Sequence, residues 1–194
     1  MSMHAQHRWD SEYQGGRWNF LRTLQEAARF GIVAGWLHHS FDSVSILDLG
    51  CGEGVFLRHL DPARVRHYHG VDLSQAALDQ FRPFGVANAT VTCAALEEFI
   101  PAADDRFDAI VFNEVLFHAG DPYAELARYR QWLTPGGVVI VSFYQTPRPT
   151  SGARRQTQDL WAALDGAGWK VLDSVTLFNE DRNLFWRLRM VQST

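Results

Sequence analysis

Val44-Ser-Ile-Leu-Asp-Leu-Gly-Cys-Gly-Glu-Gly54 is the stretch that decides the fold. Its first half, residues 44–49, is an apolar run of the length of a buried strand, and its second half places a glycine at every other position. Because glycine accepts positive φ and has no side chain, such a turn can fold tightly while its backbone approaches a ligand. Residues 55–60 then supply the apolar stripe of a helix. The stretch therefore predicts a strand, a ligand-binding turn and a helix.

The composition is that of an ordinary globular domain. The 194 residues are 46% hydrophobic and 21% charged, and the net charge of −4 gives no general attraction to nucleic acid or an anionic membrane. No run has the length or apolarity of a secretory signal or a membrane span. Two cysteines, Cys51 and Cys93, are too few for a disulfide framework and form no metal-ligand cluster. We expect one cytoplasmic domain with no metal, nucleic acid or membrane as partner.

Strand and helix patterns alternate along the chain. Further strands are expected at residues 65–71, 89–94, 107–113, 138–143, 169–177 and 184–191, and helices at 18–38, 74–81, 122–133 and 154–167. This alternation predicts a doubly wound α/β fold with a mostly parallel sheet and helices on both faces. The final two strands are separated only by a turn, which indicates an antiparallel finish.

The N-terminal part divides at Gly15-Gly16. Residues 1–17 are polar and are expected to form a mobile arm, and the single domain of residues 18–194 then begins with the helix of residues 18–38. Trp18, Arg22, Glu26 and Arg29 recur at helical spacing on one face of it. Two interpretations remain open: surface charges beside a packed Trp, or a helix that covers a ligand and directs Arg at a carboxylate.

A nucleoside cofactor is the simplest ligand for the glycine turn. In an open parallel sheet the binding crevice lies beyond the carboxyl ends of the strands, where strand order reverses. Asp72 ends the second strand about 20 residues after the turn, where a carboxylate can accept hydrogen bonds from both ribose hydroxyls. The dinucleotide motif needs a glycine where this chain has Val55, and acidic Asp48 and Glu53 repel a polyphosphate.

Four stretches in order carry a family resemblance: Leu47 to Gly54, Gly70-Val-Asp-Leu-Ser74, Phe107 to Leu116 and Leu133-Thr-Pro-Gly-Gly137. Together they resemble the successive motifs of class I S-adenosylmethionine-dependent methyltransferases. The resemblance covers residues 44–143 with specific motifs and the remainder by topology. It implies a Rossmann-like seven-stranded sheet with an antiparallel last strand, S-adenosylmethionine as cofactor and S-adenosylhomocysteine as product.

The resemblance assigns cofactor contacts residue by residue. The methionine part would lie against Asp48, Gly50, Cys51, Gly52 and Gly54, the ribose and adenine edge against Asp72 and Leu73, and the adenine against Leu96, Glu97 and the backbone carbonyl of Asn113. The family often has Asp where this chain has Ala95. Glu97 or the backbone must then bind the adenine amino group, or packing alone holds the ring.

A narrower likeness involves the first helix. Gly16-Arg-Trp-Asn-Phe20, with Glu26 and Arg29 and the stretch after Asn113, is similar to small methyltransferases of the nodulation N-methyltransferase type, which act on amino sugars. In these enzymes an N-terminal aromatic residue and an arginine cover the cofactor. The likeness implies this role for Trp18 and Arg29.

Methyl transfer is an in-line displacement that depends chiefly on alignment of the nucleophile and exclusion of water. A base is needed only for a protonated nucleophile, and Glu114 and His118, just beyond the fourth strand, are placed to act as that base or to orient an amine or hydroxyl. No Asp/Asn-Pro-Pro-aromatic stretch follows that strand, which argues against methylation of a nucleic-acid base.

The sequence thus predicts N- or O-methylation of a small metabolite, such as an amino sugar or a natural-product intermediate, by a monomer or homodimer. One alternative is a catalytically silent subunit that binds S-adenosylmethionine within a larger assembly. Another is a nicotinamide-dependent oxidoreductase, against which Val55 and the antiparallel finish argue.

Overall fold

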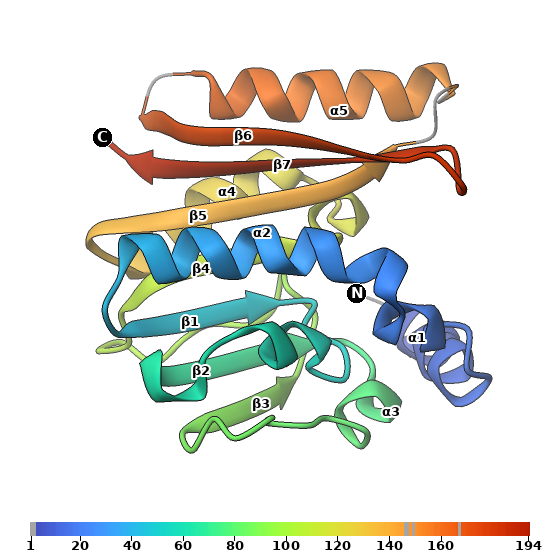
Figure 1. Ribbon diagram of the computed structural model, residues 1–194, viewed down its shortest axis with the longest axis horizontal. Helices are drawn as coiled ribbons and strands as arrows, with labels where there is room; N and C mark the ends of the chain where they lie inside the picture. Colours follow the sequence, from blue (N-terminus) through green and yellow to red (C-terminus); the bar gives the residue numbers. More distant parts are fainter. Residues whose placement is uncertain (1–2, 146–147, 149, 167) are drawn as a thin grey trace.

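Seven strands form one sheet in the order β3-β2-β1-β4-β5-β7-β6 in the computed structural model, which describes residues 3–145, 148, 150–166 and 168–194 (Figure 1). The strands are β1 (Val44–Leu49), β2 (Val65–Asp72), β3 (Ala89–Cys93), β4 (Phe107–Asn113), β5 (Leu133–Gln145), β6 (Trp169–Asn179) and β7 (Leu184–Ser193). Only β7 pairs antiparallel to its neighbours β5 and β6, whereas the other pairs are parallel. The predicted mostly parallel sheet with an antiparallel last strand is confirmed.

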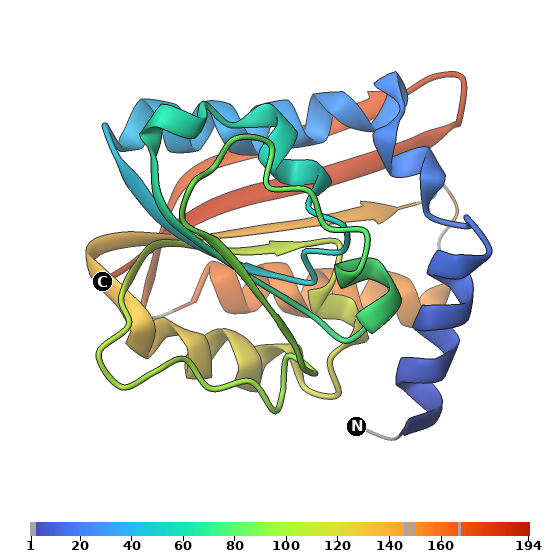
Figure 2. The ribbon, with the colours of Figure 1, turned by 90° about the horizontal axis from the view of Figure 1, so that it is seen from below.

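Helices cover both faces of this sheet. The α-helices are α1 (Met3–Gln14), α2 (Leu24–Ser40), α3 (Gln75–Leu78), α4 (Pro122–Tyr129) and α5 (Ser151–Leu164), and the 3-10 helices are η1 (Asn19–Arg22), η2 (Val55–His59), η3 (Pro62–Arg64), η4 (Leu116–His118) and η5 (Arg130–Trp132). Figure 2 shows α2 on one face and α4 with α5 on the other. Phe30, Val33 and Leu37 of α2 pack into one core layer, and Leu126 and Leu160 into the second.

Strand β1 is the switch point of the sheet. All six of its residues are buried, and it pairs in parallel with β2 on one side and β4 on the other. The chain leaves β1 toward β2 and later returns to β4, so the crevice at the carboxyl end of β1 is open to a ligand. In Figure 1 helix α1 lies beside this carboxyl edge, and Figure 2 places it at the same edge.

The N-terminal segment differs from the expectation. Residues 1–17 were expected to form a mobile arm, but residues 3–14 form helix α1, and residues 1 and 2 lie outside the described part. The expected helix of residues 18–38 is also wrong at its start. Thr23 has extended φ and ψ of −84° and 161°, which separates η1 from α2, so Trp18 and Arg22 do not share a helix with Glu26 and Arg29.

Smaller differences lie at element ends. Residues 55–59 form a 3-10 turn instead of an α-helix, because Leu60 is extended and Pro62 follows closely. The Thr134 to Gly137 stretch belongs to β5 and does not lie between helix and strand. Helix α5 begins at Ser151 and ends at Leu164, and Ala167, the expected last residue, is outside the described part. The predicted Ser74 cap is present, since its hydroxyl accepts from the amide of Ala77.

Candidate functional site

A cavity of about 480 Å³ lies at the carboxyl edge of the sheet, under α1. Its volume is within the range of about 300–1,000 Å³ that is usual for small-molecule sites. The predicted site residues that line it are Trp18, Arg29, Asp48, Gly50, Cys51, Gly52, Asp72, Leu73, Leu96, Glu97, Asn113, Glu114 and His118. Gly54 does not line it and instead starts η2. The structure thus brings nearly all the predicted residues together.

The glycine turn has the backbone that only glycine adopts easily. Gly50, Gly52 and Gly54 have φ of 76°, 54° and 83°. The turn is held against β2, because the amides of Gly50 and Cys51 both donate to the carbonyl of Val71. A Cβ on Gly52 would lie 2.5 Å from the hydroxyl of Tyr13, and one on Gly54 would lie 2.7 Å from the ring of Phe81. The turn is therefore closely packed on both sides.

Asp72 is fixed by backbone donors. Its Oδ2 accepts from the amide of Gly52 and its Oδ1 from that of Ser74, both at 2.8 Å. Burial raises the pKa of this carboxyl, and the two amides act in the opposite direction. Each oxygen retains a lone pair that can accept from a ligand hydroxyl.

Asp48 is a buried carboxyl at the end of β1. Its side chain accepts a hydrogen bond from the hydroxyl of Tyr68 at 2.6 Å, while its other oxygen, Oδ1, is buried without a partner. Burial raises the pKa of Asp48 to about 7, which the bond from Tyr68 opposes. A cationic group on a ligand would favour the ionised form.

Unpaired buried polar atoms concentrate at this cavity. Among the described residues six buried side-chain nitrogen or oxygen atoms have no hydrogen-bond partner, and five of them belong to residues that line the cavity. The five are Glu12 Oε2, which lies 3.6 Å from Arg17 Nε in an ion pair, and Trp18 Nε1, Asp48 Oδ1, Glu97 Oε2 and Asn113 Nδ2. Because such atoms are rare in folded proteins, we interpret the last four as groups that await a polar ligand.

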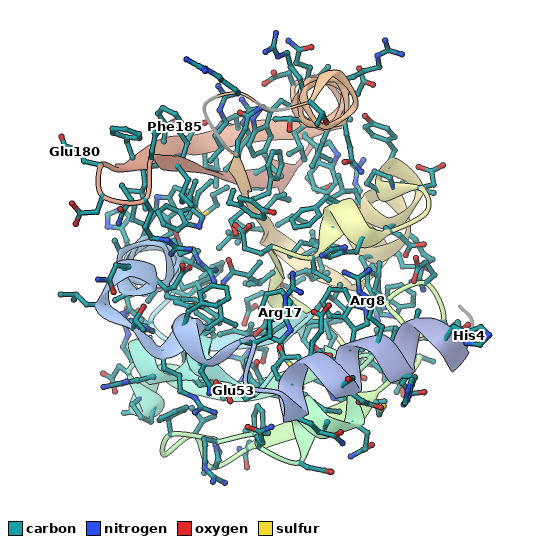
Figure 3. All side chains as sticks on the ribbon, turned by 90° about the vertical axis from the view of Figure 1, so that its right-hand side faces the viewer. His4, Arg8, Arg17, Glu53, Glu180 and Phe185 are labelled. Carbon is teal, nitrogen blue, oxygen red and sulfur yellow. The ribbon has the colours of Figure 1, made fainter. Side chains whose placement is uncertain are left out.

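Helix α1 is docked over the glycine turn and the carboxyl end of β2. Asp10 accepts from the hydroxyl of Ser74 at 2.7 Å and from the amide of Ala76 at 3.0 Å. The hydroxyl of Tyr13 lies over Gly52, and burial raises the pKa of this phenol, so it stays protonated. Figure 3 shows α1 crossing in front of this part of the molecule.

A clamp joins η1 to the glycine turn. The guanidinium of Arg22 makes a two-pronged ion pair with the buried carboxylate of Glu53, with Nε donating to Oε1 at 2.6 Å. Arg22 therefore compensates the charge of Glu53, and the sequence argument that Glu53 repels a polyphosphate is weakened. The carboxyl of Asp48 is not paired with an arginine in this way, so the argument against a polyphosphate now depends on Asp48.

A buried network connects α2 to the ends of β4 and β5. Arg29 donates from Nε to Glu26 at 2.8 Å and from Nη1 to Asn113 Oδ1 at 2.9 Å. The Ser142 hydroxyl is 2.5 Å from the same Asn113 oxygen and 3.0 Å from Glu114 Oε1. Arg29 and Asn113 thus line the cavity as parts of a fixed frame.

Glu114 and His118 both line the cavity, but the first is held by hydrogen bonds and the second by contacts with aromatic rings. Glu114 has a positive φ of 61°, and its second oxygen accepts from the amide of Tyr144 at 2.7 Å, so its own chain holds the carboxyl. Burial raises its pKa. The ring of His118 lies 5.0 Å from that of Trp9 and 4.3 Å from that of Phe117. Burial is the larger cause that lowers the pKa of His118, and the positive charge of Arg8 is the smaller one.

Leu96 and Glu97 form another wall. Leu96 is buried in the core layer beneath α4 and also lines the cavity. Glu97 Oε1 accepts from the amide of Gly120 at 3.3 Å, which leaves Oε2 as the unpaired oxygen. Glu97 can therefore accept a hydrogen bond in place of the Asp that the family often has at the position of Ala95.

Sequence reasoning missed the residues of α1 and η1. Trp9, Asp10, Glu12 and Tyr13 line or support the cavity, but residues 1–17 were expected to be an arm. The signal was present, since Gln6, Trp9 or Asp10, and Tyr13 recur at helical spacing. Pairing of Arg22 with Glu53 has no local signal, because 31 residues separate them.

The described part of the chain shows no sign of a metal or a membrane span. Within it, no three His, Cys, Asp or Glu side chains gather so that they could hold a metal ion, and none of its helices is long and apolar enough to cross a bilayer. Cys51 and Cys93 are both free thiols, the first buried and the second exposed.

Comparison with known proteins finds one matching family profile and several partial sequence matches. A family profile described as a methyltransferase domain matches residues 17–181. The ubiquinone biosynthesis O-methyltransferase of Aromatoleum aromaticum is 33% identical over 100 residues, which are 50% of this chain and 42% of that enzyme. The mitochondrial arginine-hydroxylase NDUFAF5 of Mus musculus is 31% identical over 98 residues, 50% of this chain and 28% of that protein. The match therefore spans less than half the length of these relatives.

Solved structures share the fold at low identity. The N-methyltransferase NodS of Bradyrhizobium japonicum, in complex with S-adenosylhomocysteine, has a TM-score of 0.72 at 19% identity, with 91% of each chain covered. The magnesium protoporphyrin IX methyltransferase of Synechocystis has a TM-score of 0.73 at 14% identity, with 98% of each chain covered. The [4+2]-cyclase SpnF reaches 0.69 at 17% identity, with 87% of this chain and 81% of that chain covered. These likenesses concern the fold alone.

Proposed function

The chain belongs to the methyltransferase-domain family, and from this premise we propose that it transfers a methyl group from S-adenosylmethionine to nitrogen or oxygen of a small molecule. The class I methyltransferase resemblance drawn from the sequence motifs is confirmed by the family match. The observation that carries the proposal is the cluster of unpaired buried polar atoms in the cavity at the carboxyl end of β1.

The residues present fit this cofactor. The unpaired oxygens of Asp48 and Glu97 are acceptors for amino groups, and the half-buried carboxylate of Asp72 has lone pairs for ribose hydroxyls. Gly50 and Gly52 line the cavity, and a Cβ at either position would collide with Val115 or Tyr13. We assign the methionine part to Asp48, Gly50, Cys51 and Gly52, and the nucleoside to Asp72, Leu73, Leu96, Glu97 and Asn113. Gly54 acts through the shape of the turn.

S-adenosylmethionine, when bound, supplies an electrophilic methyl group on a sulfonium. The chain has then to align the acceptor atom and exclude water. Trp18 and the docked helix α1 cover the cavity, and the buried Arg29–Asn113 network holds the wall that the acceptor meets. The task of this protein is thus mainly positional.

We assign proton removal to His118 and a positioning role to Glu114. His118 with a lowered pKa is neutral near pH 7 and can accept a proton from a hydroxyl or ammonium. Both oxygens of Glu114 are engaged by Ser142 and Tyr144, so the carboxyl fixes the end of β5 beside the acceptor. Glu114 remains the second candidate for the base.

A small acceptor is supported by the size of the cavity and by two relatives. The cavity of about 480 Å³ is partly roofed by α1, which leaves little room for a macromolecule. The relatives named above include enzymes whose names state N- and O-methyl transfer. Of the acceptors expected from the sequence, a natural-product intermediate is the kind that we propose.

Isothermal titration with S-adenosylmethionine and S-adenosylhomocysteine tests the cofactor. We expect both to bind, and Asp72→Ala to weaken binding at least tenfold through loss of the ribose contacts. Arg58→Gln, on the exposed side of η2, is the control. If neither compound gives a heat of binding, the proposal fails.

Methyl transfer is then tested with labelled cofactor and a panel of amines, phenols and carboxylates. Transfer of label to one class confirms the enzyme. The rival is a catalytically silent subunit that binds the cofactor within a larger assembly. It predicts cofactor binding with no label transfer to any acceptor until a partner protein is added.

A further inference from the structure

Aromatic rings form a continuous row along the lining of the cavity. Ring centroids follow one another at 5.7 Å from Trp18 to Trp9, 5.0 Å from Trp9 to His118, 4.3 Å from His118 to Phe117 and 6.2 Å from Phe117 to Tyr144. All five residues line the cavity. They come from α1, the segment before η1, η4 and the end of β5, so only the folded chain with α1 docked assembles this ring wall.

The ring wall is a surface for a flat ring. Trp18 contributes a further feature, because its indole nitrogen is buried without a partner and can donate a hydrogen bond to a polar substituent. His118 belongs to the same wall, so a ring lying against it brings its substituents near the base assigned above. A saturated sugar would use this surface less fully than an aromatic ring, since ring stacking adds to burial of area.

The charges beside the ring wall favour an anion. The local excess of positive charge lies at the mouth, where Arg8 and Arg17 share the single carboxylate of Glu12. A cationic amine would be repelled here, whereas a carboxylate or phosphate would be attracted.

Arg8 and Arg17 are the arginines at the mouth. Arg8 donates from Nε to Glu12 Oε1 at 3.1 Å, and Arg17 Nε lies 3.6 Å from Glu12 Oε2, so one carboxylate is shared by two cations. The side chains of both arginines are 66% exposed and retain free donor nitrogens toward solvent. Figure 3 shows the two side by side at the centre of the carboxyl edge. The guanidinium of Arg8 also lies 5.3 Å from the Trp9 ring.

We propose that the methyl acceptor is a planar aromatic compound with an anionic substituent, whose ring lies against Trp9, Phe117 and Tyr144 and whose anion is bound by Arg8 and Arg17. The inference rests on the proposed function, because it concerns the acceptor of the same site. It names a substrate class that the family match leaves open. The reacting hydroxyl or amine on the ring then faces His118.

The test is titration with three matched probes: 2-naphthoate, its neutral amide and 2-naphthylmethylamine. Each is measured with and without saturating S-adenosylhomocysteine. We expect the carboxylate to bind about tenfold more tightly than the amide and the amine to bind most weakly, with the preference reduced at high salt. Arg8→Gln and Arg17→Gln should each remove most of the preference, whereas Arg58→Gln should keep it.

The preference for an aromatic ring in the acceptor is tested by the same kind of titration. 2-Naphthoate should bind about tenfold more tightly than cyclohexanecarboxylate, and Trp9→Leu should reduce this ratio, whereas Trp36→Leu on α2 should not. Equal binding of carboxylate and amide, tighter binding of the amine, or no binding of 2-naphthoate would overturn the inference. If S-adenosylhomocysteine still binds in those cases, the methyltransferase proposal stands. If it does not bind, that proposal fails, and the probe preferences measured without cofactor decide the anion claim separately.

Discussion

Asp10 of α1 accepts a hydrogen bond from the hydroxyl of Ser74 at 2.7 Å, and this pair fastens the N-terminal helix to the site. Ser74 is fully buried and also caps α3, so its hydroxyl serves two elements at once. The same Asp10 oxygen accepts from the amide of Ala76 at 3.0 Å. Docking of α1 therefore depends on one carboxylate positioned at the start of α3.

Asp10→Ala should loosen α1 without unfolding the domain. Two hydrogen bonds to a carboxylate are lost at a half-buried position, so we expect S-adenosylhomocysteine affinity to fall about fivefold to twentyfold and the free energy of unfolding to fall by about 1 kcal/mol. Titration calorimetry measures the first, and hydrogen exchange of residues 3–14 reports the opening of α1. Asp42→Ala, at an exposed loop position, is the control. Unchanged affinity in Asp10→Ala would show that α1 contributes nothing to cofactor binding.

Gly52→Ala should damage binding more than stability. The substitution meets a left-handed φ of 54° and places a methyl 2.5 Å from the hydroxyl of Tyr13. Strain from φ alone costs about 1–2 kcal/mol. Gly136→Ala is a matched control, because its φ is 83° but the nearest atom to its Cβ is 3.9 Å away.

We expect both glycine variants to lose similar stability in urea unfolding, and only Gly52→Ala to lose S-adenosylhomocysteine affinity, by about tenfold or more. The second change Tyr13→Ala should restore part of that affinity if the clash is the cause. Equal loss of affinity in Gly136→Ala would contradict a local role for the glycine turn.

The parts of the fold that were predictable have short-range signals. Strand β1, the glycine turn and the Ser74 cap each depend on residues within about ten positions, and the alternation of elements fixed the parallel sheet. Asp72 could be placed because the end of β2 is adjacent to the end of β1 in any such sheet. The cavity lining followed from that geometry.

The helical spacing of α1 is visible in the sequence, but the docking of α1 on the site is not. A 12-residue helix is marginal by itself, and here Asp10 and Tyr13 acquire partners in α3 and the glycine turn, far along the chain. The break at Thr23 is similar, because η1 is positioned by the pairing of Arg22 with Glu53. Neither the positive φ of Glu114 nor its contacts with Ser142 and Tyr144 has a signal in the local sequence.

Asp48→Asn should stabilise the protein at alkaline pH. The pKa of Asp48 is raised to about 7 by burial, against 3.8 for the ordinary group. A raised carboxyl pKa means that stability is greatest below about pH 4, decreases as the unfolded chain ionises, and reaches its full deficit above pH 7. The shift corresponds to roughly 4 kcal/mol at most. Removal of the charge should therefore raise the melting temperature at pH 8 and change it little at pH 4.

Asp48→Asn should also bind S-adenosylmethionine at least tenfold more weakly, because the unpaired oxygen that we assign to a cationic group becomes part of a neutral amide. Asp108→Asn on β4 is the contrasting control, since Asp108 pairs with Arg66 at 2.8 Å and accepts from Ser45, and its loss should destabilise. Melting temperatures measured from pH 4 to pH 9 distinguish the stabilised Asp48→Asn variant from the destabilised Asp108→Asn variant. A variant Asp48→Asn that is less stable than the wild type at pH 8 would contradict the buried-charge argument.

His118→Phe and Glu114→Gln should have different pH profiles of methyl transfer. Because the pKa of His118 is lowered, the wild-type rate should fall only as the pH drops below the ordinary value of about 6.5, where the ring becomes protonated. His118→Phe should lower kcat about 10²-fold to 10⁴-fold and remove this acid limb. Glu114→Gln should keep the limb, because an amide can still accept from Tyr144 and donate to Ser142.

Glu114→Ala provides the matched comparison, since it leaves the Tyr144 amide without its acceptor. We expect it to lose about 1–3 kcal/mol of stability, whereas Glu114→Gln stays within about 1 kcal/mol of the wild type. Rates with the identified acceptor from pH 5 to pH 9, with unfolding curves for each variant, distinguish base from positioning residue. If Glu114→Gln abolishes turnover and the acid limb while His118→Phe retains both, the base is Glu114, and His118 serves only as part of the ring wall.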